Sequence, residues 1–268
     1  MTIVDTHSHA GINWSEPVEV ILYQMDLSNI DKTVLIQHNG NYHNQYIIEC
    51  TRRFPGRLGA VIWVDVTQPD SPETLERLSQ EEGVVGVRLH PTERSPGADP
   101  LAIWRKAAEL GIPVSCYPRS AEHSADPEFQ KIVEKLPNLT VVMEHLAGAY
   151  RPQSPESVTP PYDWYKSALT LARFPNTYIK FGGLGEFCIR PKKLEPAFGF
   201  DEILPLIDMA YEAFGPQRMM YGSDYPPVGR REGYRNSLQG VLELPIWKNQ
   251  EEKDWAFGKA ALAAFKLG

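Results

Sequence analysis

Residues 3–9 read Ile-Val-Asp-Thr-His-Ser-His, an apolar start followed at once by a polar cluster. Because side chains alternate between the two faces of a strand, we expect Asp5, His7 and His9 to point the same way. Such a cluster makes a poor core, since each buried polar group without a partner costs about 1–3 kcal/mol. It suits a metal ion or a proton transfer at the end of a strand. The plainer alternative is a hydrogen-bonded terminal strand without chemistry.

Outward from this stretch, short apolar segments alternate with longer amphipathic ones. Eight segments have the character of strands: residues 3–6, 33–37, 58–64, 84–89, 113–117, 140–143, 177–181 and 219–221. Helical patterns follow them at residues 18–27, 44–54, 72–80, 100–110, 127–136, 162–174, 201–214 and 236–243, and a final one covers 250–265.

Proline and glycine mark the ends of several helices. Asp99-Pro100 and Asp126-Pro127 read as N-caps followed by proline at the first helical position, and Gly111 is a typical C-terminal stop. Eight strand–helix units in 268 residues predict one α/β domain over residues 1–268 with the (β/α)8 TIM-barrel fold. An open doubly wound sheet is the alternative, but no glycine-rich phosphate loop follows an early strand.

Composition and charge disfavour several classes of partner. The net charge is −7, from 27 basic and 34 acidic residues, without a long basic stripe, which disfavours nucleic acid. No apolar run approaches the ~20 residues of a membrane span, and the first residues do not show the basic region followed by an apolar stretch that is expected of a secretory leader. Cys50, Cys116 and Cys188 are too few and too scattered for a disulfide framework. We expect a cytoplasmic protein with a small-molecule substrate and no nucleic-acid or membrane partner; a homo-oligomer stays open.

The active site of a TIM barrel lies at the carboxyl ends of its strands. Polar residues stand at each predicted strand end: His7 and His9; Gln37 and His38; Trp63 and Asp65; Arg88 and His90; Tyr117 and Arg119; Glu144 and His145; Lys180 and Glu186; Ser223 and Asp224. Such a ring is hard to explain by stability alone. Asp224 stands out, because Gly-Ser-Asp-Tyr-Pro places a carboxylate in a restricted turn, where it can bind a metal or take a proton from water. We expect His38 on the rim and Cys116 as a small buried hydrophobe.

These segments resemble the amidohydrolase superfamily. DTHSH at 5–9, GVRLHP at 86–91, MEHLAG at 143–148 and GSDYP at 222–226 are most similar to its amidohydrolase-2 branch. That branch includes sugar-acid lactonases, pyrone-dicarboxylate lactonases and related decarboxylases. The resemblance covers most of the chain and implies a barrel fold.

The resemblance also implies catalytic roles. His7, His9 and Asp224 match the positions that hold a divalent metal, zinc above all, in metal-dependent members. The counterpart of Asp224 there is also the general base for the hydrolytic water. His145 matches a histidine that contacts the substrate carbonyl or the reacting group.

A second set of residues is expected to bind substrate. Arg88 and Arg94 resemble arginines that hold substrate carboxylates, for which a planar guanidinium is suited. Tyr117 fits a substrate-contacting role in the lactonases. The expected set is completed by Arg119, His90 and Trp63.

One departure concerns the metal. Metal-dependent members carry a histidine or a modified lysine at the end of strand five, whereas this strand ends Ser115-Cys116-Tyr117-Pro118. Three protein ligands can still hold zinc with water completing the shell, and the branch contains members that need no metal. Both options stay open. Glu144 is a further ligand only if it faces inward with His145, which strand alternation argues against.

The leading hypothesis is a hydrolase that opens a lactone or related cyclic ester of an acidic small molecule. Asp224 is the base, and His145 and Arg88 stabilise the oxyanion. The alternatives are a zinc-dependent decarboxylase, which the missing strand-five ligand disfavours, and a non-catalytic small-molecule-binding barrel. A metal-dependent nuclease would need a carboxylate where Arg88 stands. We expect specificity to reside in the loops at 151–161 and 187–198.

Overall fold

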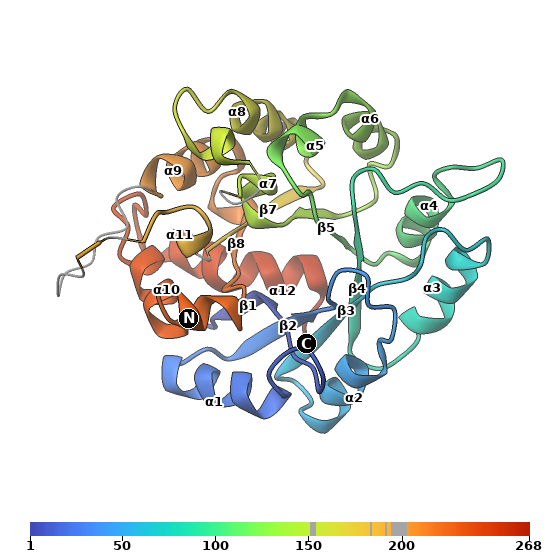
Figure 1. Cartoon of the computed structure of the whole chain (residues 1–268), viewed down its shortest axis with the longest axis horizontal. Helices are drawn as coiled ribbons and strands as arrows, with labels where there is room; N and C mark the ends of the chain where they lie inside the picture. The colour runs from blue at the N-terminus through green and yellow to red at the C-terminus, as the bar shows by residue number, and fades with distance from the viewer. Residues whose placement is uncertain (151–153, 183, 191, 194–202) are drawn as a thin grey trace.

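Eight parallel strands and their connecting helices form a ring (Figure 1). The computed structural model describes residues 1–150, 154–182, 184–190, 192–193 and 203–268. The strands are β1 (Val4–Ser8), β2 (Lys32–Ile36), β3 (Leu58–Ile62), β4 (Val84–Leu89), β5 (Val114–Cys116), β6 (Val141–Met143), β7 (Thr177–Phe181) and β8 (Met219–Tyr221). Each strand pairs in parallel with the next one along the chain. The predicted (β/α)8 TIM barrel is confirmed.

Helices connect the strands and surround the ring. They are α1 (Val18–Ser28), α2 (Gln45–Arg53), α3 (Ser71–Ser79), α4 (Ala102–Leu110), α5 (Ala121–Ala125), α6 (Pro127–Lys135), α7 (His145–Gly148), α8 (Asp163–Leu169), α9 (Leu204–Phe214), α10 (Tyr234–Leu242), α11 (Gln250–Asp254) and α12 (Ala260–Phe265). A π-helical turn, Trp255–Lys259, joins α11 to α12, and 3₁₀ turns lie at Pro155–Val158, Thr170–Arg173, Leu184–Glu186, Pro216–Arg218 and Pro227–Arg230. The sequence patterns do not predict the short helices α5 and α7. The predicted helix 201–214 begins in residues 201–202, which lie outside the described part.

Local signals account for several helix ends. The Asp126 side chain accepts a hydrogen bond from the Glu128 amide and caps α6 as predicted. Gly111 ends α4 with a positive φ of 63°, which costs glycine little. The predicted cap at Asp99 is wrong, because α4 begins later; Asp99 instead accepts a hydrogen bond from the Leu101 amide at 3.0 Å.

The inside of the barrel is apolar at its base and polar at its mouth. One buried cluster joins strand residues to α12; it contains Val4, Val34, Ile36, Val61, Val142, Met220, Ala261, Ala264 and Phe265. The helix α12 therefore closes the base of the barrel. Above this layer, Lys180 of β7 lies with its amino group 5.6 Å from the centre of the Phe265 ring.

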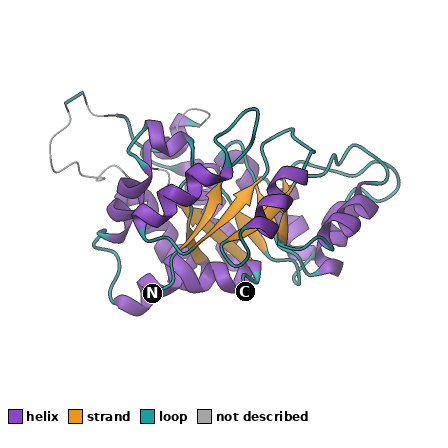
Figure 2. Cartoon of the chain, turned by 90° about the horizontal axis from the view of Figure 1, so that it is seen from below, coloured by secondary structure: helices purple, strands orange, loops and turns teal. Residues whose placement is uncertain are grey.

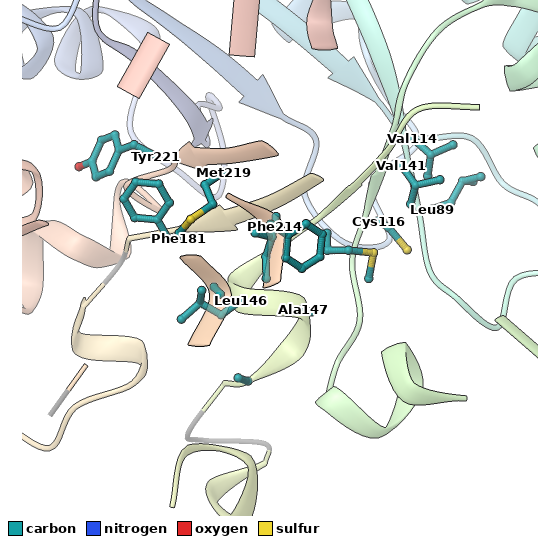
Figure 3. Packing of buried hydrophobic residues seen from close by; sticks show 14 of the residues in the cluster. Leu89, Val114, Cys116, Val141, Leu146, Ala147, Phe181, Phe214, Met219 and Tyr221 are labelled. Carbon is teal, nitrogen blue, oxygen red and sulfur yellow. The ribbon is translucent and has the colours of Figure 1, made fainter. Parts of the chain in front are cut away.

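A second apolar layer lies between the strands and the outer helices. Figure 3 shows Phe181, Met219 and Tyr221 close together in it. The ring of Phe181 stands 5.4 Å from that of Phe257 in an edge-to-face arrangement. Cys116 belongs to the same layer and is fully buried, as predicted.

The barrel closes where β8 meets β1. The Thr6 hydroxyl donates to the Tyr221 carbonyl at 2.6 Å, and the Asp224 amide donates to the His7 carbonyl at 2.8 Å. The His9 amide donates to the Tyr225 carbonyl at 2.7 Å. This seam brings the first and last strands together, although more than 200 residues separate them.

Both chain ends lie on the side of the barrel opposite to the carboxyl ends of the strands (Figure 2). Lys32, at the start of β2, donates a hydrogen bond to the carbonyl of the terminal Gly268. Within the described residues, no helix combines the length and the apolar character needed to cross a membrane.

Candidate active site

The first strand delivers His7 and His9, but not Asp5, to the mouth of the barrel. Asp5 pairs with Thr33 and Ser8 with Leu35, so β1 carries one residue more than β2 over this stretch. Such a bulge interrupts the alternation of side chains. The expectation that Asp5 shares a face with the histidines is therefore wrong.

Asp5 instead connects the two segments that carry the site. Its buried carboxylate accepts hydrogen bonds from the Ser223 amide at 2.8 Å and from the Tyr234 hydroxyl at 2.9 Å. It also accepts one from the His7 amide at 3.1 Å. Asp5 thereby holds the end of β1 against the turn that precedes Asp224.

His7, His9 and Asp224 converge at the seam. The His7 and His9 Nε2 atoms lie 3.8 and 3.6 Å from Asp224 Oδ1, and one ligand atom from each of the three residues lies within 4.8 Å of the others. The Nδ1 atom of His9 contacts the Ile36 carbonyl at 2.7 Å, so Nδ1 carries the proton and Nε2 keeps its lone pair. His7 Nε2 is buried and has no hydrogen-bond partner among the described residues.

Burial also keeps His7 neutral. It lowers the pKa of His7 well below the ordinary value, and the nearby charge of Lys180 lowers it further. Two imidazoles and a carboxylate are a donor set that suits zinc.

Asp224 is paired with a second carboxyl group. Burial opposes its ionisation, but the neighbouring Glu186 and His9 side chains outweigh burial and lower the pKa of Asp224. Burial and the charge of Asp224 raise the pKa of Glu186 well above its usual value. Arg231 approaches both groups, at 3.3 Å from Asp224 Oδ2 and 3.5 Å from Glu186 Oε1. Asp224 is therefore ionised, while Glu186 retains its proton.

His145 faces the same space through an unusual backbone. Its φ is +49°, and Leu146 and Ala147 also have positive φ values. Its Nδ1 lies 2.8 Å from Glu186 Oε2, and its ring stands 4.7 Å from that of His7. The expectation that Glu144 faces away from His145 is wrong, because the strand has ended and the left-handed backbone turns both side chains inward.

Glu144 anchors a buried ionic network beneath His7. Arg88 Nη2 donates to its Oε2 at 2.7 Å, and the Ser115 hydroxyl donates to its Oε1 at 2.7 Å. Lys180 Nζ donates to Ser115 at 2.8 Å and lies 3.4 Å from His7 Nδ1. Where the resemblance leads one to expect a metal ligand on strand five, Ser115 joins Lys180 to Glu144.

The site opens into a chamber of about 230 Å³. Its lining includes the predicted residues His9, Arg88, Tyr117, His145 and Asp224. The guanidinium of Arg88 lies 4.4 Å from the centre of the Tyr117 ring and 5.1 Å from that of Trp63. Arg88 also donates to the Gln37 carbonyl, so two of its five N–H groups stay available to a ligand.

Four predicted substrate-binding residues, Arg94, Arg119, His90 and Trp63, stand outside the chamber. Arg94 donates to the carbonyls of Pro91 and Glu93, both at 2.8 Å, and Arg119 is exposed. His90 contacts the Thr92 hydroxyl through Nδ1 at 2.7 Å. Like Trp63, they are not among the chamber-lining residues of the described part.

The structure adds residues to which the sequence assigns no role. His38, expected on the rim, stacks on His9 at 4.6 Å and lines the chamber, and burial lowers its pKa to about 4. Tyr150 also lines the chamber, and burial raises its pKa to about 12. Lys180 and Glu186 stand at the end of a predicted strand, and this position in the sequence indicates that they belong to the site. Arg231 has no comparable signal, because it belongs to no strand end and no periodic pattern.

The loops expected to set specificity are described only in part. Residues 151–153 of the first loop and residues 191 and 194–198 of the second lie outside the described residues. Within the first loop, Pro155–Val158 forms a 3₁₀ turn.

Comparison with known proteins identifies the family. A family model described as amidohydrolase matches residues 15–267. No curated protein matches the sequence. Among solved structures, a probable 2-pyrone-4,6-dicarboxylic acid hydrolase from Acinetobacter baumannii with bound citric acid is similar. It has 18% sequence identity and a TM-score of 0.75, over 99% of this chain and 100% of that one.

Two other solved structures share the fold. An amidohydrolase from Burkholderia multivorans with bound zinc has 17% identity and a TM-score of 0.79, with 100% of both chains covered. The 5-carboxyvanillate decarboxylase of Sphingomonas paucimobilis has 13% identity and a TM-score of 0.64, over 100% of this chain and 99% of that one. With the family match over most of its length and these barrels as neighbours, the chain belongs to the amidohydrolase family and is an enzyme of the amidohydrolase-2 branch of that superfamily.

Proposed function

We propose that this enzyme hydrolyses a lactone or related cyclic ester of a small acidic molecule, with Asp224 as the general base. The observation that supports this most directly is the convergence of His7, His9 and Asp224 beside a chamber that His9, Asp224, His145 and Arg88 line. A base, a second acid group and cationic donors around one cavity are what ester hydrolysis requires.

Asp224 is suited to accept the proton of the attacking water. Its pKa is lowered, so it is ionised at neutral pH. Next to it lies a void of about 10 Å³, bordered by His7, His145, Lys180 and Asp224 and of the size that one water molecule needs. As the water oxygen forms its bond to the lactone carbonyl carbon, its proton passes to Asp224.

His145 and Glu186 are suited to donate a proton to the leaving group. The ring C–O bond of the lactone breaks, and the departing oxygen needs a proton. Glu186 holds a proton because burial and the charge of Asp224 raise its pKa, and it lies 2.8 Å from His145 Nδ1. His145 can accept this proton at Nδ1 and donate the one at Nε2 to the leaving oxygen.

The remaining N–H groups of Arg88 can stabilise the carbonyl oxygen as it becomes negative, or hold a carboxylate of the substrate. The Tyr117 ring packs against the Arg88 guanidinium and lines the same chamber. The citric acid bound in the Acinetobacter structure supports an acidic ligand for this site. Contacts of Arg94, Arg119, His90 and Trp63 with the substrate stay predictions.

His7, His9 and Asp224 would hold a divalent metal, with zinc the best candidate. The fit rests on the unpartnered, buried Nε2 of His7 and on the free lone pair of His9 Nε2. When bound, the metal would lower the pKa of a water molecule and polarise the carbonyl. The zinc in the Burkholderia structure supports this choice.

The test is hydrolysis of a panel of acidic lactones, including 2-pyrone-4,6-dicarboxylate, with metal analysis of the purified protein. Asp224→Asn should lower kcat by about 10²–10⁴-fold and leave the circular dichroism spectrum unchanged. The matched control is Asp65→Asn, since Asp65 follows β3 and its carboxylate bonds only with Thr67 and Gln68 in the described part. Full activity of Asp224→Asn would refute the assignment. Release of CO₂ from an aromatic acid, with no lactone hydrolysed, would identify a decarboxylase instead.

A further inference from the structure

A second, larger compartment adjoins the catalytic chamber. Its volume is about 980 Å³, and it shares His9, His38 and Pro227 with the chamber as lining residues. The chamber of about 230 Å³ lies below the ~300–1,000 Å³ of ordinary ligand pockets, whereas the outer compartment lies at the top of that range. Because the two spaces share these lining residues, a ligand that extends from the chamber past His9 and His38 enters the outer compartment.

Two side chains of this compartment are not used by the fold. Trp14 is 88% exposed, although it is the largest apolar side chain, and it lines the compartment. Arg230 also lines it and forms no hydrogen bond or ion pair with any described residue. An indole face and a free guanidinium both favour a flat ligand, because each can stack, and the guanidinium also pairs with a carboxylate.

The charges of the compartment favour a ligand with a single negative charge. Arg231 already faces Asp224 and Glu186, so its charge is compensated. Among the described residues that line the compartment, Arg230 is the cation left for a ligand. Glu16 lines the same compartment and disfavours a second negative group beside it.

We infer that the outer compartment binds the distal part of the substrate, a planar aromatic group with one carboxylate, which stacks on Trp14 and pairs with Arg230. This inference rests on the proposed function only for the reacting end of the substrate, the lactone ring, which would bind in the catalytic chamber. The substrate class is then a lactone that carries an aryl carboxylate, larger than a single ring.

The first test measures the binding of the distal group alone, without turnover of a substrate. The probe is 4-fluorobenzoate, titrated into the full-length protein and followed by ¹⁹F NMR, with neutral 4-fluorobenzamide for comparison. Trp14→Ala and Arg230→Gln should each raise the dissociation constant of the benzoate about fivefold or more, the size expected for one stacking or charge contact. Arg230→Gln should leave the weaker binding of the benzamide unchanged.

Matched controls are Trp164→Ala and Arg77→Gln, two exposed residues outside the compartment, which should leave benzoate binding unchanged. Absent benzoate binding, or binding equal in Trp14→Ala, Arg230→Gln and wild type, would overturn the inference.

A kinetic comparison separates this inference from the proposed function. A γ-lactone with a 4-carboxyphenyl substituent should be hydrolysed with a higher kcat/KM than the unsubstituted lactone, and Trp14→Ala and Arg230→Gln should remove that advantage. Equal kcat/KM for both lactones, with hydrolysis dependent on Asp224, would overturn the inference and keep the proposed function. Hydrolysis of neither lactone, with benzoate binding lost in both variants, would support the compartment and count against the proposed reaction.

Discussion

Replacing Glu144 with glutamine should destabilise the protein by about 3 kcal/mol. Glu144 is fully buried and lies between Arg88, Lys180 and Ser115. Burial alone would raise its pKa, but the charges of Arg88 and Lys180 outweigh burial and lower it from 4.5 to about 2. At about 1.4 kcal/mol for each pH unit, the ionised carboxylate contributes on the order of 3 kcal/mol to folding.

Lys180 can reduce the loss of stability in Glu144→Gln. Burial lowers the pKa of Lys180 to about 8, although Glu144 acts in the opposite direction. In Glu144→Gln the amine can therefore lose its proton, whereas Arg88 stays charged and buried without its partner. Removal of one member of a buried ion pair typically costs about 3–5 kcal/mol, which agrees with the figure from the pKa.

The assay is urea unfolding at pH 7, followed by circular dichroism. The surface control Glu76→Gln, which removes an exposed partner of Lys106, should stay within about 0.5 kcal/mol of wild type. The double variant Arg88→Met/Glu144→Gln should recover part of the loss, because it leaves no unpaired arginine. The pKa of Glu144 is lowered in the fold, so its stabilisation is present above about pH 4.5 and fades as the pH falls toward 2. A Glu144→Gln midpoint equal to that of wild type at the same m value would refute the reasoning.

Three further changes test other parts of the site. Glu186→Gln should lower kcat at least about 10-fold with little change in KM, because it removes the proton that reaches His145; an unchanged kcat would contradict the relay. Gly222→Ala should lower both kcat and stability, because its Cβ would lie 2.8 Å from the Cβ of His7; wild-type kinetics and unfolding would show that the seam can adjust. Burial raises the pKa of Glu93 to about 7, so its contribution to stability is present below about pH 4.5 and is lost as the pH rises through 7. Glu93→Gln should flatten that dependence, and unfolding midpoints between pH 5 and 8 would reveal it.

Much of the architecture was predictable from local patterns. Apolar β-rich segments and the amphipathic segments between them predict all eight strands, and no strand bound differs from its prediction by more than two residues. The prediction fails where a tertiary contact overrides the pattern. Asp5 leaves the face of His7 because β1 carries an extra residue, and Glu144 joins His145 because the backbone there adopts positive φ.

The amino-acid sequence by itself determined the barrel, since periodicity and turn residues act over a few positions, and it placed His7, His9, His145 and Asp224 at strand ends. Tertiary structure alone decided which partners each of them has. The seam between β8 and β1 brings Asp224 beside the first strand, and it also brings in Glu186 and Arg231. These contacts depend on long-range closure of the barrel, and the pKa values of buried groups depend on what surrounds them in space, so neither can be read from neighbours along the chain.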